Sequence, residues 1–205
     1  MKTTVYLIRH GNIDCEDRVP GRMPGMHLSS HGQKQARDLL HFFENRKLEA
    51  IYSSPMDRAL ETAKPLAEKK GLKVEICEAF NEIDFGDWTN RKFSELENDF
   101  SWKQFHFFRN GTVIPGGELM IEVQSRMVGQ LQQLIEKHEG RDFAVFSHND
   151  PIKSVIAFYG GISLDLFLRL TIDTGSVSVL SYEKDQSVID MINITGDFKL
   201  FREHK

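Results

Sequence analysis

The chain is poor in cysteine and lacks any long apolar run. Its two cysteines, Cys15 and Cys77, are too few and too isolated for a disulfide framework or for a metal site of the C-x-x-C kind. No apolar stretch approaches the roughly 20 residues that a membrane span needs. The first strand begins by Thr3, which leaves no room for the apolar core of a signal peptide. We therefore expect a cytoplasmic protein that does not act at a membrane.

The chain also lacks an excess of basic residues. It has 26 Lys and Arg against 30 Asp and Glu, a net charge of -4, which gives no positive field for nucleic acid. Its 205 residues are 40% hydrophobic, enough for one sizeable core, and no repeat or linker divides them. We expect a single domain over residues 1–205 with a small-molecule partner, and the sequence leaves its oligomeric state open.

Several motifs for nucleotide binding and nucleophilic catalysis are missing. Neither cysteine is followed by arginine at C-x5-R spacing, and no P-loop or G-x-G-x-x-G is present. No G-x-S-x-G surrounds Ser147 or Ser176, which argues against an α/β-hydrolase. A dinuclear metal site using Asp14, His148 and Asp150 stays conceivable, although no H-E-x-x-H supports it.

Short apolar runs alternate with helical periodicities along the chain. This pattern predicts an α/β fold, a three-layer sandwich with a mostly parallel central sheet flanked by helices. We expect Ser54 and Asp150 to be helix N-caps, each followed by a proline in the first turn. The expected strands are 5–8, 50–53, 74–76, 143–146 and two or three near 168–172, 176–182 and 188–194, and the expected helices are 30–45, 55–71, 118–138 and one after Asp150.

Residues 78–117 show no clean period and are expected to form a lid-like insertion. Short helices are predicted within it at 92–96 and 100–109. This part of the chain is rich in aromatic side chains, which line a pocket or simply belong to the core. These residues are Trp88, Trp102, Phe105, Phe107 and Phe108.

The tripeptide Arg9-His10-Gly11 directly follows a buried strand. In an open α/β sheet, ligands bind beyond the carboxyl ends of the strands. Glycine at such a point permits a close backbone approach to a ligand or a sharp turn. The arrangement indicates a nucleophilic histidine beside a fixed cation.

Two further constellations also follow strands. Arg58 is expected in the first turn of a helix, where its guanidinium and the helix N-terminus face an anion together, or else on the surface paired with Glu61. His148 ends another apolar strand. Together with Arg9 and His10, these residues would form a cationic pocket with imidazole donors, which suits a phosphoryl group.

A carboxylate cluster, Glu82, Asp84 and Asp87, lies among apolar side chains. Burial would raise the pKa of one of these carboxyl groups and keep a proton available for a leaving oxygen, whereas nearby arginines would lower it. The alternative is a capped acidic loop, and the sequence leaves both open.

In this order, the pieces resemble the histidine phosphatase superfamily, which includes cofactor-dependent phosphoglycerate mutases and many small phosphatases. The resemblance covers nearly the whole chain. It is carried by Leu7-Ile8-Arg9-His10-Gly11, Leu28-Ser29-Ser30-His31-Gly32-Gln33-Lys34-Gln35-Ala36, Ser53-Ser54-Pro55 with Arg58, Ala59, Glu61 and Thr62, Glu82-Ile83-Asp84-Phe85-Gly86-Asp87-Trp88, Pro115-Gly116-Gly117-Glu118, and Ser147-His148.

The resemblance implies phosphoryl transfer through a phosphohistidine on His10. Arg9, Arg58 and His148 would hold the phosphoryl oxygens, and Glu82 would protonate the leaving group and then activate water. No metal or cofactor is implied. Asn12 and Asn149, next to the two histidine motifs, are further candidates for substrate binding. Arg22 helps to hold an acidic substrate or only pins its loop.

The chain departs from the family at a few positions. Asn12, Ile13 and Glu16 stand where many members have Glu or Gln, Thr and Asn, and His148 is followed by Asn149 and Asp150 where Gly is frequent. Ile83 follows Glu82, where the related mutases carry arginine. We therefore expect a phosphoric monoester hydrolase acting on a small phosphorylated substrate. The alternatives are a phosphoglycerate mutase-type phosphotransferase and a non-catalytic module that binds a phospho-ligand.

Overall fold

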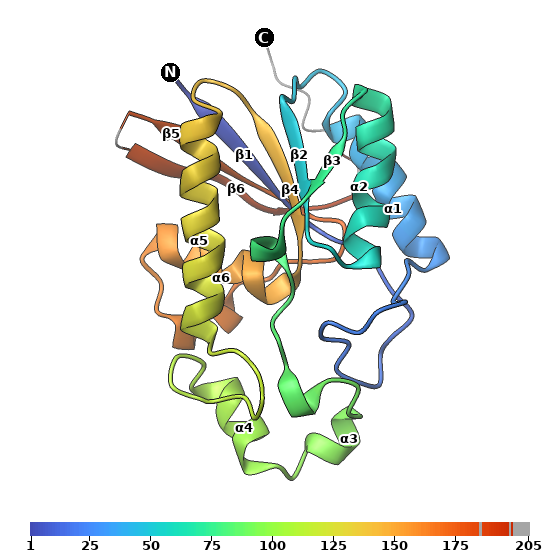
Figure 1. Cartoon of the computed structure of the whole chain (residues 1–205), viewed down its shortest axis with the longest axis vertical. Helices are drawn as coiled ribbons and strands as arrows, with labels where there is room; N and C mark the ends of the chain where they lie inside the picture. The colour runs from blue at the N-terminus through green and yellow to red at the C-terminus, as the bar shows by residue number, and fades with distance from the viewer. Residues whose placement is uncertain (185, 197, 199–205) are drawn as a thin grey trace.

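The computed structural model describes residues 1–184, 186–196 and 198 and has alternating strands and helices (Figure 1). The short 3₁₀ helices that lie wholly within the described residues are η1 (Glu78–Phe80), η2 (Gly86–Trp88) and η3 (Leu164–Arg169). The strands are β1 (Thr3–Arg9), β2 (Ala50–Ser53), β3 (Val74–Ile76), β4 (Phe143–Ser147), β5 (Val177–Glu183) and β6 (Gln186–Ile194). The α-helices are α1 (Ser30–Phe42), α2 (Asp57–Lys70), α3 (Phe93–Leu96), α4 (Phe100–Phe107), α5 (Met120–Lys137) and α6 (Asn149–Gly160).

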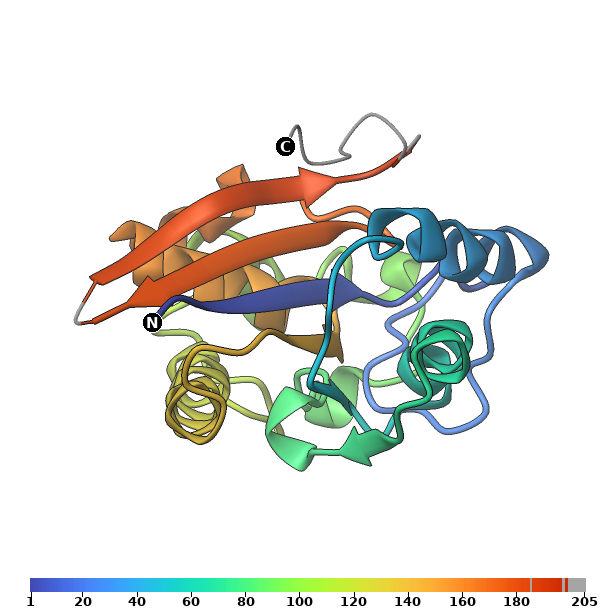
Figure 2. The ribbon, with the colours of Figure 1, turned by 90° about the horizontal axis from the view of Figure 1, so that it is seen from above.

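The strands form one sheet in the order β3-β2-β4-β1-β5-β6. β3, β2, β4 and β1 are parallel, and β5 and β6 continue the sheet in antiparallel pairing. Helices α1 and α2 cover one face, and α5 and α6 cover the other (Figure 2). The predicted α/β fold with a mostly parallel sheet flanked by helices is therefore confirmed.

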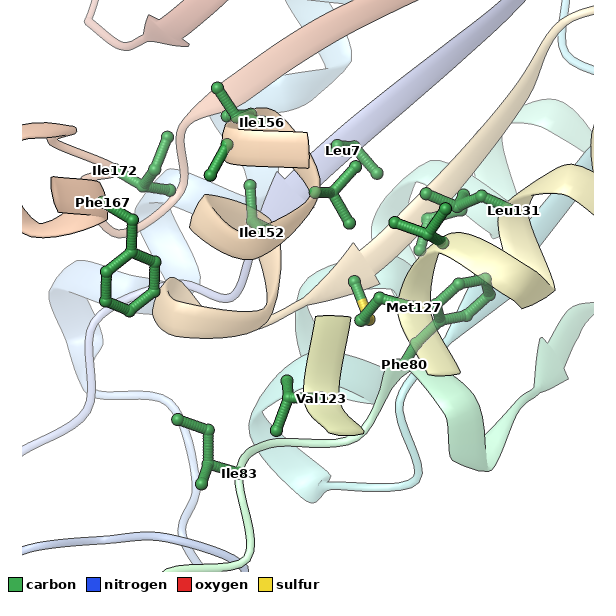
Figure 3. Close-up of a cluster of buried hydrophobic side chains, with 14 of the residues drawn as sticks. Leu7, Phe80, Ile83, Val123, Met127, Leu131, Ile152, Ile156, Phe167 and Ile172 are labelled. Atoms are coloured by element: carbon green, nitrogen blue, oxygen red, sulfur yellow. The ribbon is translucent and has the colours of Figure 1, made fainter. Parts of the chain in front are cut away.

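The side chains of β1 alternate between the two layers of core, as the period of a strand requires. Val5 and Leu7 belong to the cluster that includes α5 and α6, part of which is drawn in Figure 3. Tyr6 and Ile8 belong to the cluster on α1 and α2. This strand is buried on both faces and so reads as a continuous apolar run.

Of the two or three final strands predicted, two are present as β5 and β6, and the third, at 168–172, is wrong. The segment 168–172 overlaps η3 (Leu164–Arg169), which Ser163 caps by accepting a hydrogen bond from the Asp165 amide. Leu164 and Phe167 are buried at a spacing of three residues, the period of a 3₁₀ helix. The apolar residues of this turn resemble a strand in sequence because the run is too short to show its period.

Both predicted proline-linked caps are also wrong. The N-cap of α2 is Met56, and the N-cap of α6 is His148. Ser54 lies 2.8 Å through its Oγ from Nε2 of His148. Asp150 Oδ2 accepts from Arg109 Nη1 at 2.8 Å. Each side chain thus interacts with a residue distant in sequence.

Segment 78–117 contains α3 and α4, which lie beyond the end of the sheet where β1 and β4 finish (Figure 1). Its aromatic residues divide between the core and the surface, and an exposed position is neither of the two expected roles. Trp88 and Phe105 are buried in the core, whereas Phe107 is 81% exposed. No helix in the described part of the chain is long and apolar enough to cross a membrane.

The loop after β1 packs directly against the first turn of α1. A Cβ on Gly32 would lie 2.1 Å from the Asn12 carbonyl oxygen, and one on Gly11 would lie 2.6 Å from the Gly32 oxygen. Ser29 secures the approach by accepting from the Gly32 amide and donating to Asn12 Oδ1. The two glycines therefore fix the backbone that follows His10.

Replacing Gly32 by alanine is expected to destabilise the protein by about 1–3 kcal/mol, because the added methyl group overpacks a rigid backbone contact. Gly129→Ala is the matched control, since Gly129 lies in α5 and a Cβ added there would meet nothing within 4 Å. It should raise stability by about 0.5–1 kcal/mol. Urea unfolding of both variants measures the difference, and shifts of the same sign would contradict this account of the loop.

Candidate active site

Three parallel strands deliver the central residues to one edge of the sheet. Arg9 pairs with Ser147 across β1 and β4, and Ser53 pairs with Phe146 across β2 and β4. The residues that directly follow the ends of these strands are His10 after β1, His148 after β4 and Ser54 after β2. The register therefore places the three residues side by side. The ring centroids of His10 and His148 lie 5.1 Å apart. The parallel register thus converts three separate motifs into one site.

His10 is buried, and its two ring nitrogens have different partners. Nδ1 lies 2.7 Å from the Gly11 carbonyl oxygen, which only accepts, so the proton resides on Nδ1. Nε2 accepts from Arg58 Nε at 3.3 Å and carries the lone pair. Burial and then the charges of Arg58 and Arg9 hold the His10 pKa well below its ordinary value. The ring is neutral and nucleophilic near neutral pH.

Arg58 lies in the first turn of α2 and is completely buried. Its Nη2 donates to the Gly21 carbonyl at 2.8 Å. Glu61, its alternative partner, instead contacts His27 Nδ1 at 2.6 Å and accepts from the Leu28 amide. The surface interpretation of Arg58 is therefore wrong.

The site carries buried nitrogen atoms that have no hydrogen-bond partner within the described residues. They are Arg9 Nε, Arg58 Nη1 and His148 Nδ1. Arg9 is otherwise held by a 2.6 Å hydrogen bond from Nη1 to the Ile172 carbonyl. Leaving buried donors unpaired costs free energy, and an anion with several oxygens would satisfy them.

Glu82 follows η1 and brings a carboxyl group to the same place. Oε1 accepts from the Ile83 amide at 3.0 Å, and Oε2 lies 3.6 Å from His148 Nδ1 and 3.9 Å from Arg58 Nη2. Burial raises the pKa of Glu82 to about 7, although the Arg58 charge opposes the rise. The carboxyl group can therefore hold or release a proton near neutral pH.

His148 is oriented by Ser54, for which the sequence predicts only a capping role. Burial, followed by the charge of Arg58, holds the His148 pKa well below its ordinary value. The Ser54 hydroxyl can donate to Nε2, and the proton then resides on Nδ1, the atom without a partner. In that tautomer, His148 presents a donor to an anion. The sequence signal for this role is that Ser54 directly follows a strand, as His10 and His148 do.

Thr62 is a second residue for which the sequence predicts no contact within the site. Its Oγ1 accepts from the Gly11 amide at 2.9 Å and donates to the Arg58 carbonyl at 2.6 Å. It therefore links the His10 loop to the first turns of α2. Its place in the Arg58 motif was the available signal.

A cavity of about 440 Å³ opens beside these groups. Candidate residues Arg9, His10, Asn12, Glu82 and Asn149 line it. The side chains of Asn12 and Asn149 are already engaged, with Ser29 and Asp150 respectively. The aromatic part of the wall consists of Phe85, Phe93 and Trp102.

Arg22 contacts protein groups around the cavity. Its Nε donates to the Glu82 carbonyl at 2.8 Å, and its Nη2 donates to Glu118 at 2.7 Å. Both contacts support a loop-pinning role. Through the Glu82 backbone, Arg22 helps to place the buried carboxyl group.

One group in the described part of the chain has metal-ligand geometry. Ligand atoms of His10, Glu82 and His148 lie within 4.8 Å of one another, and this group includes neither Asp14 nor Asp150. However, Arg58 already donates to His10 Nε2, and its charge lies beside Glu82. These positive neighbours favour an anion over a metal cation.

Comparison with known proteins agrees with this arrangement. Residues 5–195 match the Histidine phosphatase superfamily (branch 1). The chain is 30% identical over 202 residues to Phosphoserine phosphatase 1 of Hydrogenobacter thermophilus. The aligned region covers 95% of this chain and 95% of that protein.

Solved structures show the same fold. YhfR of Bacillus stearothermophilus is similar with a TM-score of 0.90 and 25% identity, covering 96% of this chain and 99% of that one. Phosphoserine phosphatase of Entamoeba histolytica, in complex with 3-phosphoglyceric acid, has a TM-score of 0.86 and 24% identity with the same coverage. With its motifs converging on one buried site, the chain belongs to branch 1 of the histidine phosphatase superfamily.

Proposed function

We propose that the chain hydrolyses small phosphomonoesters through a covalent phosphohistidine on His10, without a metal ion. The observation that carries this proposal is the neutral His10 ring, whose Nε2 accepts from Arg58 Nε in a site that also holds a protonatable Glu82. The same site contains two donors without partners, Arg58 Nη1 and His148 Nδ1. Phosphate monoesters are among the slowest bonds to hydrolyse in water. Fixed positive charge and a covalent intermediate both lower that barrier.

In the first step, His10 Nε2 attacks phosphorus and the bond to the ester oxygen breaks. Arg9, Arg58 and His148 hold the phosphoryl oxygens, and Glu82 gives its proton to the departing alkoxide. In the second step, the Glu82 carboxylate takes a proton from water while the water oxygen attacks phosphorus. The bond to His10 breaks, inorganic phosphate leaves, and Glu82 is protonated again.

The mutase alternative has less support. Ile83, at the position after Glu82, is fully buried in the core cluster that contains Phe80 and Val123. It offers no charge for a second phosphate. Hydrolysis therefore accounts better for this cavity than transfer between phosphoglycerates.

A phosphoryl group from a radiolabelled ester is expected to be trapped on wild-type protein in an acid-labile bond. The label should disappear in His10→Ala, because the attacking nitrogen is lost. His41→Ala removes an exposed histidine of α1 and should label normally. Undiminished labelling of His10→Ala would overturn the proposal.

Activity is expected to depend on the proton of Glu82. A carboxyl group with a raised pKa stays protonated up to about pH 7, so kcat/KM for an alkyl phosphate should fall above that pH. Glu82→Gln should lower kcat by about 10²- to 10⁴-fold and remove this alkaline limb. Glu97→Gln, an exposed control, should keep both. Persistence of the limb in Glu82→Gln would assign the titration to another group.

Metal removal is expected to have no effect on turnover. The Arg58 and Arg9 charges perform the anion stabilisation that a cation would otherwise supply. Dialysis against EDTA, followed by assay with and without added divalent ions, makes the comparison. A loss of activity that a divalent ion restores would contradict the metal-independent mechanism.

A further inference from the structure

An ion pair beside the reacting groups takes no part in the phosphoryl transfer described above. Arg109 follows α4, and Asp150 lies in the first turn of α6, two residues after His148. Arg109 Nη1 donates to Asp150 Oδ2 at 2.8 Å. The two side chains are 6% and 10% exposed.

Aromatic rings and an amide hold the pair in place. The Arg109 guanidinium lies 3.8 Å from the Phe105 ring centroid and 5.1 Å from that of Phe167. Asn149 Nδ2 donates to Asp150 Oδ1 at 2.9 Å. A stacked guanidinium and a carboxylate with two donors are oriented before any ligand arrives.

The pair still has unused hydrogen-bonding capacity. Arg109 Nε is buried and has no hydrogen-bond partner within the described residues. Each oxygen of Asp150 accepts one hydrogen bond from the protein, and a carboxylate oxygen can accept two. A buried donor without a partner, such as Arg109 Nε, destabilises a fold and calls for an explanation.

Arg109 and Asp150 line the same cavity as His10 and Glu82. The Asp150 charge is close enough to raise the pKa of Glu82. Glu82 lines this cavity together with Arg109 and Asp150 and is the proposed donor to the leaving oxygen, so the alcohol part of the ester would extend into this cavity. Lys153 is a second buried cation near this pair, with its ammonium 6.0 Å from the Phe167 ring centroid. Lys153 is not among the residues that line the cavity, whereas Arg109 is.

We propose that Arg109 and Asp150 form a subsite for a zwitterionic leaving group, an alcohol that carries both a carboxylate and a primary ammonium. Arg109 donates to the carboxylate, and Asp150 accepts from the ammonium. A purely anionic group would meet the charge of Asp150, and a purely cationic group would meet that of Arg109. This inference rests on the proposed phosphatase function and specifies its substrate class.

Four phosphate esters test the contributions of the leaving group's carboxylate and ammonium separately. O-phosphoserine carries both groups, 3-phosphoglycerate replaces the ammonium by hydroxyl, phosphoethanolamine lacks the carboxylate, and 2-hydroxyethyl phosphate lacks both. Wild-type kcat/KM is expected to be highest for O-phosphoserine. Loss of either charge should lower it by about tenfold or more, because each leaves one buried charge without its ligand.

The variants should remove one preference each. Asp150→Asn is expected to abolish the preference for O-phosphoserine over 3-phosphoglycerate, and Arg109→Met the preference for O-phosphoserine over phosphoethanolamine. Ratios are compared because a loosened fold would slow all four esters together. Glu16→Gln and Arg18→Gln change charged residues that line the same cavity and should leave both ratios unchanged.

Equal wild-type rates on the four esters, or variants that keep both ratios, would overturn the subsite. Failure of the phosphatase function is a different result, in which no ester turns over and His10 takes up no label. The subsite is then measured by calorimetric binding of the same four compounds to His10→Ala. A zwitterion preference that Asp150→Asn or Arg109→Met removes from that protein supports it, and the absence of any preference refutes it.

Discussion

The buried guanidinium of Arg58 is the interaction on which the rest of the site depends. It donates to His10 Nε2, is anchored on the Gly21 carbonyl, and lies 3.9 Å from Glu82. Its charge helps to lower the pKa of both histidines and opposes the effect of burial on Glu82. One cation therefore influences the protonation of the proposed nucleophile, donor and acid together.

A charge buried in this way is costly unless it is paired. Glu82 compensates Arg58 only in part, because burial leaves its carboxyl group with a pKa of about 7. A bound phosphoryl dianion would complete the compensation, so the resting site is arranged for an anion before it arrives. The surrounding fold maintains this state: the Gly11–Gly32 contact fixes the His10 loop, and Thr62 joins that loop to the helix of Arg58.

Local patterns in the sequence were sufficient for the fold class and for the convergence of His10, Arg58 and His148. These residues follow apolar strands or open a helix, and the carboxyl ends of parallel strands meet at one sheet edge. The family resemblance added Glu82, whose burial depends on its packing. Burial distinguishes a protonatable carboxyl group from an ordinary acidic loop, and short sequence windows do not reveal it.

The wrong predictions for the two helix caps and for the aromatic residues of segment 78–117 share a physical cause. Ser54 and Asp150 precede prolines in the manner of helix caps, yet their side chains bind His148 and Arg109, which are distant in sequence. Tertiary partners of this kind compete successfully with a local cap. The aromatic residues of segment 78–117 divide between core and surface for the same reason, since their spacing alone does not show which face α4 presents to the fold.

The central claim is that His10 is a neutral imidazole with its proton on Nδ1 and its lone pair on Nε2. Nitrogen-15 NMR of the histidine rings in the resting protein tests it directly. The account predicts a His10 signal at neutral pH with Nδ1 protonated and Nε2 bare, and no charging of the ring until well below the usual histidine pKa. A doubly protonated ring at neutral pH, or a proton on Nε2, would contradict it.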